Sequence, residues 1–260
     1  MPRGPTAALA VLTICLAACG ASQVARSPDA TPSGSPSAAA FRVLVLSRTL
    51  GFRHDSIPDG VAALTELGRS NGFAVEATED AAAFTPSNLS RYRAVVFLST
   101  TGEVLAGGQQ DALRGFVRSG GGFVGIHSAA DTLYDWPWYG GLVGAYFKQH
   151  PAIQSARIRV EDRAHPSTLS LPDPWTRRDE WYDFRANPRP RVHVLLTLDE
   201  SGYGGGSMGA DHPIAWCHEY DGGRAWYTAL GHVSEAYGDP IFRGHLLGGI
   251  RYAAGAAGRC

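Results

Sequence analysis

Three histidines follow glycine-containing turns at the ends of apolar segments. His54 comes after the sequence GFR, His127 after GI, and His232 directly after a glycine. Glycine allows a backbone to approach a ligand closely, and an imidazole transfers protons near neutral pH or coordinates a metal ion. We therefore predict that the three histidines share one site and act there as catalytic groups.

Carboxylates, hydroxyls and aromatic rings near these histidines complete the predicted site. Glu180 is predicted to be catalytic, because a carboxylate can orient an imidazole ring. Aromatic side chains can stack on the apolar face of a ring-shaped ligand. Contacts with the substrate are predicted for Asp55, Ser128, Trp181, Tyr182, His212 and Glu235.

The other histidines have weaker arguments for a role in chemistry. His150 and His165 each precede a proline, which disfavours helical conformation at the residue before it. We expect structural roles for both. His193 and His245 lie in a strand-like and a helix-like segment, and nothing in their surroundings places them at a site.

A divalent metal ion is a further use for the histidines and carboxylates. No short spacing of the His-Glu-x-x-His kind occurs in the chain. Any ligands would have to come from distant loops, and sequence alone does not show which loops meet. The cofactor and the metal ligands therefore stay open at this stage.

The segment over 120–130, GGGFVGIHSAA, leads from a buried strand into a sharp turn with a polar residue at its apex. This arrangement resembles a nucleophile elbow and is similar to that of class I glutamine amidotransferases, whose apex residue is cysteine. His127 stands at the apex here, so thiol-dependent amidotransferase chemistry is not expected. A hydrolase with Ser128 as nucleophile would need glycine where Ala130 stands, which disfavours that alternative.

Apolar runs alternate with helical patterns through the first half of the main segment. Since alternating strands and helices form parallel sheets, the loops over 51–55, 99–103 and 127–131 should meet at one edge, beyond the carboxyl ends of their strands. The second half should extend the sheet and cover that crevice. We expect strands at 41–47, 73–77, 94–98, 122–126, 153–161, 192–198, 213–220 and 224–230, and helices at 57–70, 109–117 and 242–254.

Several motifs in a fixed order indicate a family. They are GFRHDSI from residue 51, GGGFVGIHSAAD from 120, DEWYDF over 179–184, DHPIAW over 211–216 and GRAWYTALGHVSEAY over 223–237. Together they resemble the ThuA (trehalose utilisation) family over residues 41–254. The resemblance implies an α/β fold of the glutamine-amidotransferase-like (flavodoxin-like) type, a mostly parallel sheet flanked by helices, with additional strands in the second half. It also implies a role in the metabolism of a disaccharide or keto-sugar.

The first forty residues predict export and anchoring. Residues 1–18 have the pattern of a signal peptide, and the sequence LAACG resembles a bacterial lipobox, with Cys19 as the lipidated residue. Residues 19–40 form a linker rich in Ala, Ser and Pro, a composition that cannot bury enough apolar surface to fold. Residues 41–255 are predicted to form one ThuA-like domain, held on the extracytoplasmic face of the cell membrane.

Charge and cysteine content limit the partners. The net charge is −1, and removal of the leader with its one charged residue, Arg3, changes it to −2. A nearly neutral chain gives no reason to expect nucleic acid as a partner. Two cysteines, Cys217 and Cys260, remain after the leader and the anchor, in a compartment that permits a disulfide between them.

Two functions are compatible with these observations. The first is a surface-anchored protein that acts on a small-molecule sugar by His/carboxylate acid–base chemistry. The alternative is a non-catalytic carbohydrate-binding lipoprotein. The sequence leaves open whether the protein is an enzyme, and also its oligomeric state.

Overall fold

The computed structural model describes residues 1–2, 4, 8–10 and 40–260. Cys19 and nearly all of the predicted signal peptide and linker lie outside these residues. In the part of the chain that the structure describes, no helix is long and apolar enough to cross a membrane.

A nine-stranded sheet organises the chain from residue 40 onward, in the order β2-β1-β3-β4-β11-β10-β9-β6-β7. The first five strands in this order are parallel, and the remaining four continue the sheet in antiparallel fashion. The predicted parallel core with a strand extension from the second half is thus present. The strands of this sheet are β1 (Arg42–Leu46), β2 (Ala74–Thr78), β3 (Ala94–Leu98), β4 (Gly122–Ile126), β6 (Gln154–Val160), β7 (Trp175–Asp179), β9 (His193–Asp199), β10 (Pro213–Tyr220) and β11 (Gly223–Thr228).

Burial along the strands follows from their place in the sheet. Every residue of β3 and β4 is buried, as expected for parallel strands covered on both faces. In β7, buried residues alternate with exposed ones, because one face of this outer strand meets solvent. A separate antiparallel pair joins β5 (Phe147–Gln149) to β8 (Asp183–Phe184).

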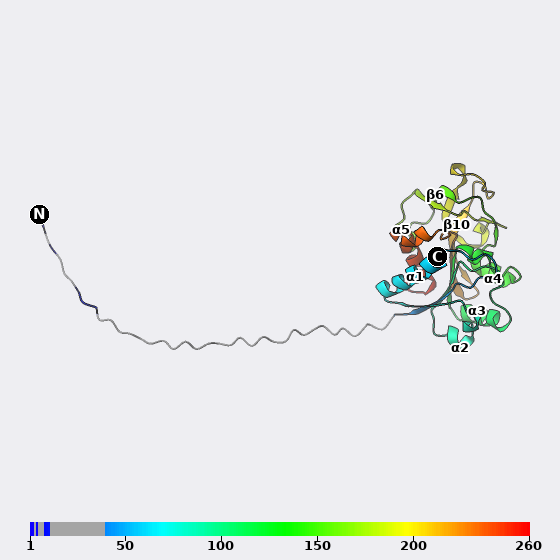
Figure 1. The fold of residues 1–260 in the computed structure, drawn as a ribbon, viewed down its shortest axis with the longest axis horizontal. Coiled ribbons are helices and arrows are strands. Elements are labelled where there is room, and N and C mark those ends of the chain that lie inside the picture. The colour runs from blue at the N-terminus through cyan, green and yellow to red at the C-terminus, as the bar shows by residue number, and fades with distance from the viewer. Residues whose placement is uncertain (3, 5–7, 11–39) are drawn as a thin grey trace. The chain divides into compact units, whose positions relative to one another are not determined.

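Helices cover both faces of the sheet. Figure 1 shows α1 and α5 on one side, and α2, α3 and α4 on the other. Glycine at 122 makes the approach of α5 possible, because a Cβ there would lie 2.1 Å from the carbonyl oxygen of Ala253. The helices are α1 (Ile57–Asn71), α2 (Pro86–Leu89), α3 (Gly108–Arg118), α4 (Pro137–Val143) and α5 (Pro240–Ala253).

A disulfide joins Cys217 on β10 to Cys260 at the end of the chain, with 5.7 Å between the Cα atoms. Cys217 is completely buried. The bond therefore holds the segment that follows α5 against the antiparallel half of the sheet.

Candidate active site

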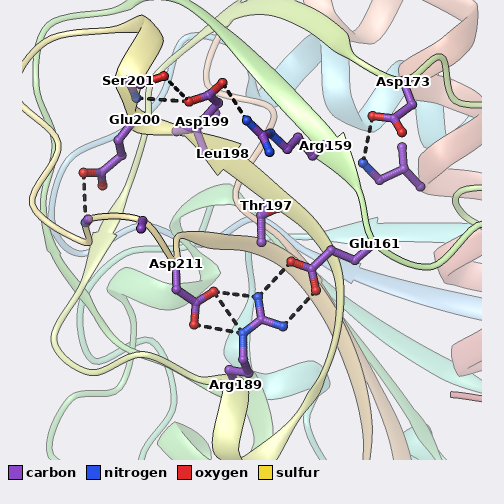
Figure 2. A pocket seen from close by; sticks show the side chains of 13 residues that line it. Arg159, Glu161, Asp173, Arg189, Thr197, Leu198, Asp199, Glu200, Ser201 and Asp211 are labelled. Atoms are coloured by element: carbon purple, nitrogen blue, oxygen red, sulfur yellow. Dashed lines mark hydrogen bonds and ion pairs between the residues drawn. The ribbon is translucent and has the colours of Figure 1, made fainter.

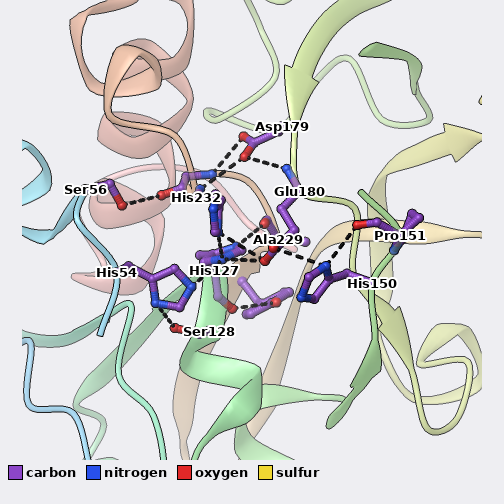
Figure 3. Close-up of polar contacts among 12 residues, drawn as sticks. His54, Ser56, His127, Ser128, His150, Pro151, Asp179, Glu180, Ala229 and His232 are labelled. Carbon is purple, nitrogen blue, oxygen red and sulfur yellow. Dashed lines mark hydrogen bonds and ion pairs between the residues drawn. The ribbon is translucent and has the colours of Figure 1, made fainter. Parts of the chain in front are cut away.

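All four predicted catalytic residues meet beyond the carboxyl ends of the parallel strands (Figure 3). His54 lies between β1 and α1, His127 follows β4 directly, and His232 follows β11. The ends of β4 and β11 are neighbours in the sheet, with Ile126 paired to Thr228. Sheet topology therefore brings together side chains that are up to 178 residues apart in the sequence, the separation of His54 and His232.

The backbone at His127 has an unusual conformation. Its φ is +53°, in the left-handed region that residues with a side chain rarely adopt. Such a strained conformation persists only where the surrounding structure holds it in place, and it is often found at functional sites. The sharp turn predicted after β4 is present, and it directs the imidazole of His127 into the cluster.

Glu180 reaches the cluster from the antiparallel half of the sheet. It follows β7, which is separated from β11 by three strands, yet its Oε2 lies 3.4 Å from Nε2 of His127. The antiparallel half of the sheet therefore brings the end of β7 over the ends of β4 and β11. This agrees with the prediction that the second half covers the crevice.

Asp179 fixes Glu180 and His232 relative to each other. Its carboxylate is fully buried. Oδ1 accepts hydrogen bonds from the backbone N–H groups of Glu180, at 2.9 Å, and His232, at 3.1 Å, and Oδ2 accepts one from Gly231 at 3.0 Å. One carboxylate thus joins two of the loops that supply the site.

Nitrogen and oxygen atoms from four side chains point at a common centre. Nε2 of His127 lies 3.1 Å from Nε2 of His54 and 3.3 Å from Nδ1 of His232. Oε2 of Glu180 lies 3.1 Å from the same Nδ1 of His232. One ligand atom from each of the four residues lies within 4.8 Å of the other three.

Electrostatics at the cluster shift the pKa values of its histidines in opposite directions. Burial, together with positive charge on His127 and His232, lowers the pKa of His54 to about 3, so the His54 ring is neutral at physiological pH. Burial alone would raise the pKa of Glu180, but its contacts with His127 and His232 outweigh the effect of burial and lower that pKa. Burial would lower the pKa of His232, whereas its contact with Glu180 raises it overall.

A cavity of about 320 Å³ opens onto the cluster. The ring of Tyr182 lies 4.4 Å from that of His127 and 4.2 Å from that of Phe147, measured between centroids. The cavity therefore has a polar floor and aromatic walls. Its lining comprises Phe52, His54, Asp131, Phe147, His150, Glu180, Tyr182 and His232.

Sequence reasoning missed several residues at this cavity. His150, expected to be structural, is 41% exposed and places Nδ1 3.1 Å from Oε1 of Glu180. Asp131 accepts a hydrogen bond from the hydroxyl of Tyr134 at 2.6 Å, and burial raises the pKa of Asp131. The GIHSAAD motif contained Asp131 and the DEWYDF motif contained Asp179, but neither motif indicated a role for its aspartate.

Some predicted substrate contacts lie elsewhere. Trp181 is fully buried, and its indole N–H donates to the carbonyl of Gln154, so the structure places it in the core. Asp55 and Glu235 are exposed and do not line the cavity. Ser128 is buried with Oγ 3.4 Å from Nδ1 of His54, a long contact for a nucleophile–base pair.

His212 belongs to a second cluster, on the far side of Tyr182. Its Nε2–H donates to the carbonyl of Tyr182 at 2.9 Å, and its Nδ1 lies 2.7 Å from a carboxylate oxygen of Glu200. Asp183 is close by, but it accepts hydrogen bonds from Ser207. Because these groups already have partners, the structure gives His212 a supporting position behind the wall of the cavity.

A larger cavity, of about 1090 Å³, is elsewhere and strongly charged (Figure 2). At its centre, Arg189 forms paired hydrogen bonds with Glu161 and Asp211. Arg159 is likewise paired with Asp199. Its arginines are thus neutralised, and no histidine lines this cavity, in contrast to the smaller one.

Fold and site together define a class of protein. The chain has an α/β domain with a parallel core sheet, and it carries a His/carboxylate cluster at the carboxyl ends of the strands, where α/β proteins bind their ligands. Residues 42–253 match the family model described as ThuA, trehalose utilisation. The chain belongs to the ThuA family.

Solved structures of similar fold include two ThuA-like proteins. A putative ThuA-like protein from Bacteroides uniformis has a TM-score of 0.72 and 24% identity, over 85% of this chain and 94% of that one. One from Parabacteroides merdae has a TM-score of 0.69 and 21% identity, over 82% and 90% of the two chains. At these identities the likeness concerns the fold alone. Comparison with curated proteins found no match.

Proposed function

We propose that the protein is a metal-dependent enzyme that modifies a sugar. The observation that carries this proposal is the surroundings of Nε2 of His127. Nδ1–H of the same ring donates to the carbonyl of Ala229 at 2.9 Å, so Nε2 of the neutral ring presents a lone pair. That lone pair faces His54, His232 and Glu180. A single proton could satisfy one of these contacts, whereas a cation at the centre would satisfy all four groups.

The donor set suits a divalent ion such as zinc. Imidazole nitrogens and a carboxylate oxygen are its usual ligands, at about 2.1 Å, and atoms at the corners of such a tetrahedron lie about 3.4 Å apart. Four of the six distances between donors in the cluster are 3.1, 3.1, 3.3 and 3.4 Å. The bond from His127 to Ala229 would fix the ring orientation, as partners of metal-bound histidines do.

Residues of this chain would divide the work between holding the ion and handling protons. His54, His127, His232 and Glu180 would hold the ion, which would act as a Lewis acid on a carbonyl or hydroxyl oxygen of the sugar. His150 and Asp131 line the cavity outside this donor set. They are placed to accept or donate the proton of a sugar hydroxyl.

The substrate class follows from the family and the cavity. The family is linked to trehalose utilisation, and the cavity combines polar groups with the rings of Tyr182 and Phe147, as carbohydrate sites require. We propose a disaccharide or keto-sugar as substrate. No nucleic acid is expected as a partner.

The place of action is proposed to be the extracytoplasmic face of the cell membrane, with a lipid anchor at Cys19. The lipobox-like LAACG sequence supports the anchor. The disulfide between Cys217 and Cys260 supports an oxidising compartment.

Metal analysis and turnover measurements test the proposal on the full-length protein. We expect about one equivalent of divalent metal in the wild type and loss of it in His127→Ala. The matched control is His193→Ala, which removes an exposed histidine that pairs with Asp162 and should keep the metal. NMR would follow trehalose, other disaccharides and their keto forms, with and without chelator.

The alternative, a non-catalytic carbohydrate-binding lipoprotein, is supported by the absence of a cysteine at the apex position, where His127 stands. It predicts that sugars raise the melting temperature without being converted. A protein that neither retains metal nor responds to any sugar would refute both functions.

A further inference from the structure

The turn after β1 presents an aromatic ring to solvent at the mouth of the cavity. Phe52 is 65% exposed, and it lines the cavity that opens onto the histidine cluster. Leu50, two residues earlier, is 57% exposed. No other aromatic residue is as exposed in the described part of the chain. Exposed apolar side chains grouped beside a cavity indicate a binding surface.

Hydrogen bonds to Thr101 hold this turn in place. The backbone N–H of Leu50 donates to the carbonyl of Thr101 at 2.8 Å, and the N–H of Gly51 donates to its Oγ1 at 3.2 Å. The hydroxyl of Thr101 in turn donates to the carbonyl of Phe52 at 2.8 Å. Thr101 is itself buried, so the turn is attached to the core directly before and at Phe52.

Two further contacts orient the turn. Arg53 forms paired hydrogen bonds with Glu79, at 2.7 and 3.1 Å. The ring of Phe52 meets that of His54 edge to face, with 4.9 Å between centroids. The exposed ring is thus held beside a residue of the cluster. Because its position is already fixed, the ring loses less conformational entropy when a ligand binds.

The size of the cavity limits what can enter. About 320 Å³ is at the lower end of the range for small-molecule sites, roughly 300–1000 Å³. One sugar ring enclosed between Phe147, Tyr182 and the cluster would leave a second ring outside, at the mouth. Phe52 is the aromatic surface available there.

We propose that Phe52 is a specificity-determining residue that stacks on the second ring of a disaccharide while the first ring occupies the cavity. This inference rests on the proposed function and adds to it a preference for disaccharides over monosaccharides. Stacking on one aromatic face corresponds to about tenfold in affinity.

The test compares variants of the full-length, metal-loaded protein. Dissociation constants for trehalose and for glucose would be measured by calorimetry for the wild type, Phe52→Ala and Phe52→Trp. Leu169→Ala is the matched control, since Leu169 is 68% exposed and does not line the cavity. Metal content and sedimentation velocity of each variant would be recorded in parallel.

We expect Phe52→Ala to weaken trehalose binding about tenfold and to leave glucose binding and metal content unchanged. Phe52→Trp should retain binding, and Leu169→Ala should behave as wild type. Equal trehalose affinity in the wild type and Phe52→Ala would overturn the inference and leave the proposed function standing. A wild type that binds no sugar would overturn both. Self-association lost in Phe52→Ala would identify the turn as an interface between copies instead.

Discussion

Replacement of Asp179 by asparagine should damage the site without touching a residue that faces the cavity. The buried carboxylate accepts three backbone hydrogen bonds, two on Oδ1 and one on Oδ2. Asparagine can keep the two bonds on one oxygen, but its NH₂ group would then face the N–H of Gly231. Hydrogen bonds to a charged group contribute about 1.5–3 kcal/mol each, and an unsatisfied buried donor adds to the loss.

From these contacts we expect Asp179→Asn to lower the free energy of unfolding by about 3–4 kcal/mol. The bond that is lost is the one to Gly231, which directly precedes His232, so the loop that carries His232 would shift relative to Glu180. Mutation of residues that hydrogen-bond to metal ligands typically lowers metal affinity 10–100-fold. We expect Asp179→Asn to lower the zinc affinity by a factor within this range.

Urea unfolding and zinc titration against a competing chelator measure the two effects. Asp221→Asn is the matched control, because Asp221 is exposed and accepts both its side-chain bonds, from Trp138 and Arg118, on a single oxygen. Asparagine can retain these bonds, so the control should stay within about 1 kcal/mol of wild type. An Asp179→Asn protein with wild-type stability and a zinc dissociation constant within threefold of wild type would refute the reasoning.

Three further predictions concern pH, the disulfide and proton transfer. Burial lowers the pKa of His245 to about 3, so the unfolded chain binds a proton below about pH 6.5 that the folded chain excludes. Between pH 8 and pH 5 this one group should lower the free energy of unfolding by about 2 kcal/mol, and urea unfolding of His245→Asn should show a pH-dependent loss smaller by that amount than the loss of the wild type. Cys260→Ser removes the disulfide, which joins residues 43 positions apart, and should lower the free energy of unfolding by about 2–4 kcal/mol. A calorimetric measurement that shows no change in stability would contradict this prediction. His150→Ala should keep the metal and lower turnover at least tenfold, and loss of metal in this variant would contradict the division of roles.

Much of the fold could be predicted from the sequence, because the core strands are short apolar runs between loops. The run AVVFL matches β3 to the residue, and α1 differs from its predicted range by one residue. By contrast, β7 was not predicted. Its sequence, WTRRD, has Arg178 on the exposed face and Arg177 and Asp179 on the buried face, so its apolar content is too low to indicate a strand.

The candidate site was partly predictable for a related physical reason. His54, His127 and His232 could be grouped, because residues that follow parallel strands meet at one edge of the sheet. His150 and Asp179 could not, because their positions depend on how the antiparallel half folds back over that edge. The burial of Trp181 and the location of His212 behind Tyr182 are likewise properties of three-dimensional packing that local patterns do not contain.

The strand order has a consequence for how the site comes into being. His54 is the first of the cluster residues to be synthesised, whereas His232 follows the last strand, and Glu180 follows a strand at the opposite edge of the sheet. No partly folded intermediate that lacks β7 or one of the strands β1, β4 and β11 can present all four donors. An ion bound by the complete set would stabilise only the fully folded chain, so the protein would acquire its metal after folding, from the compartment in which folding ends.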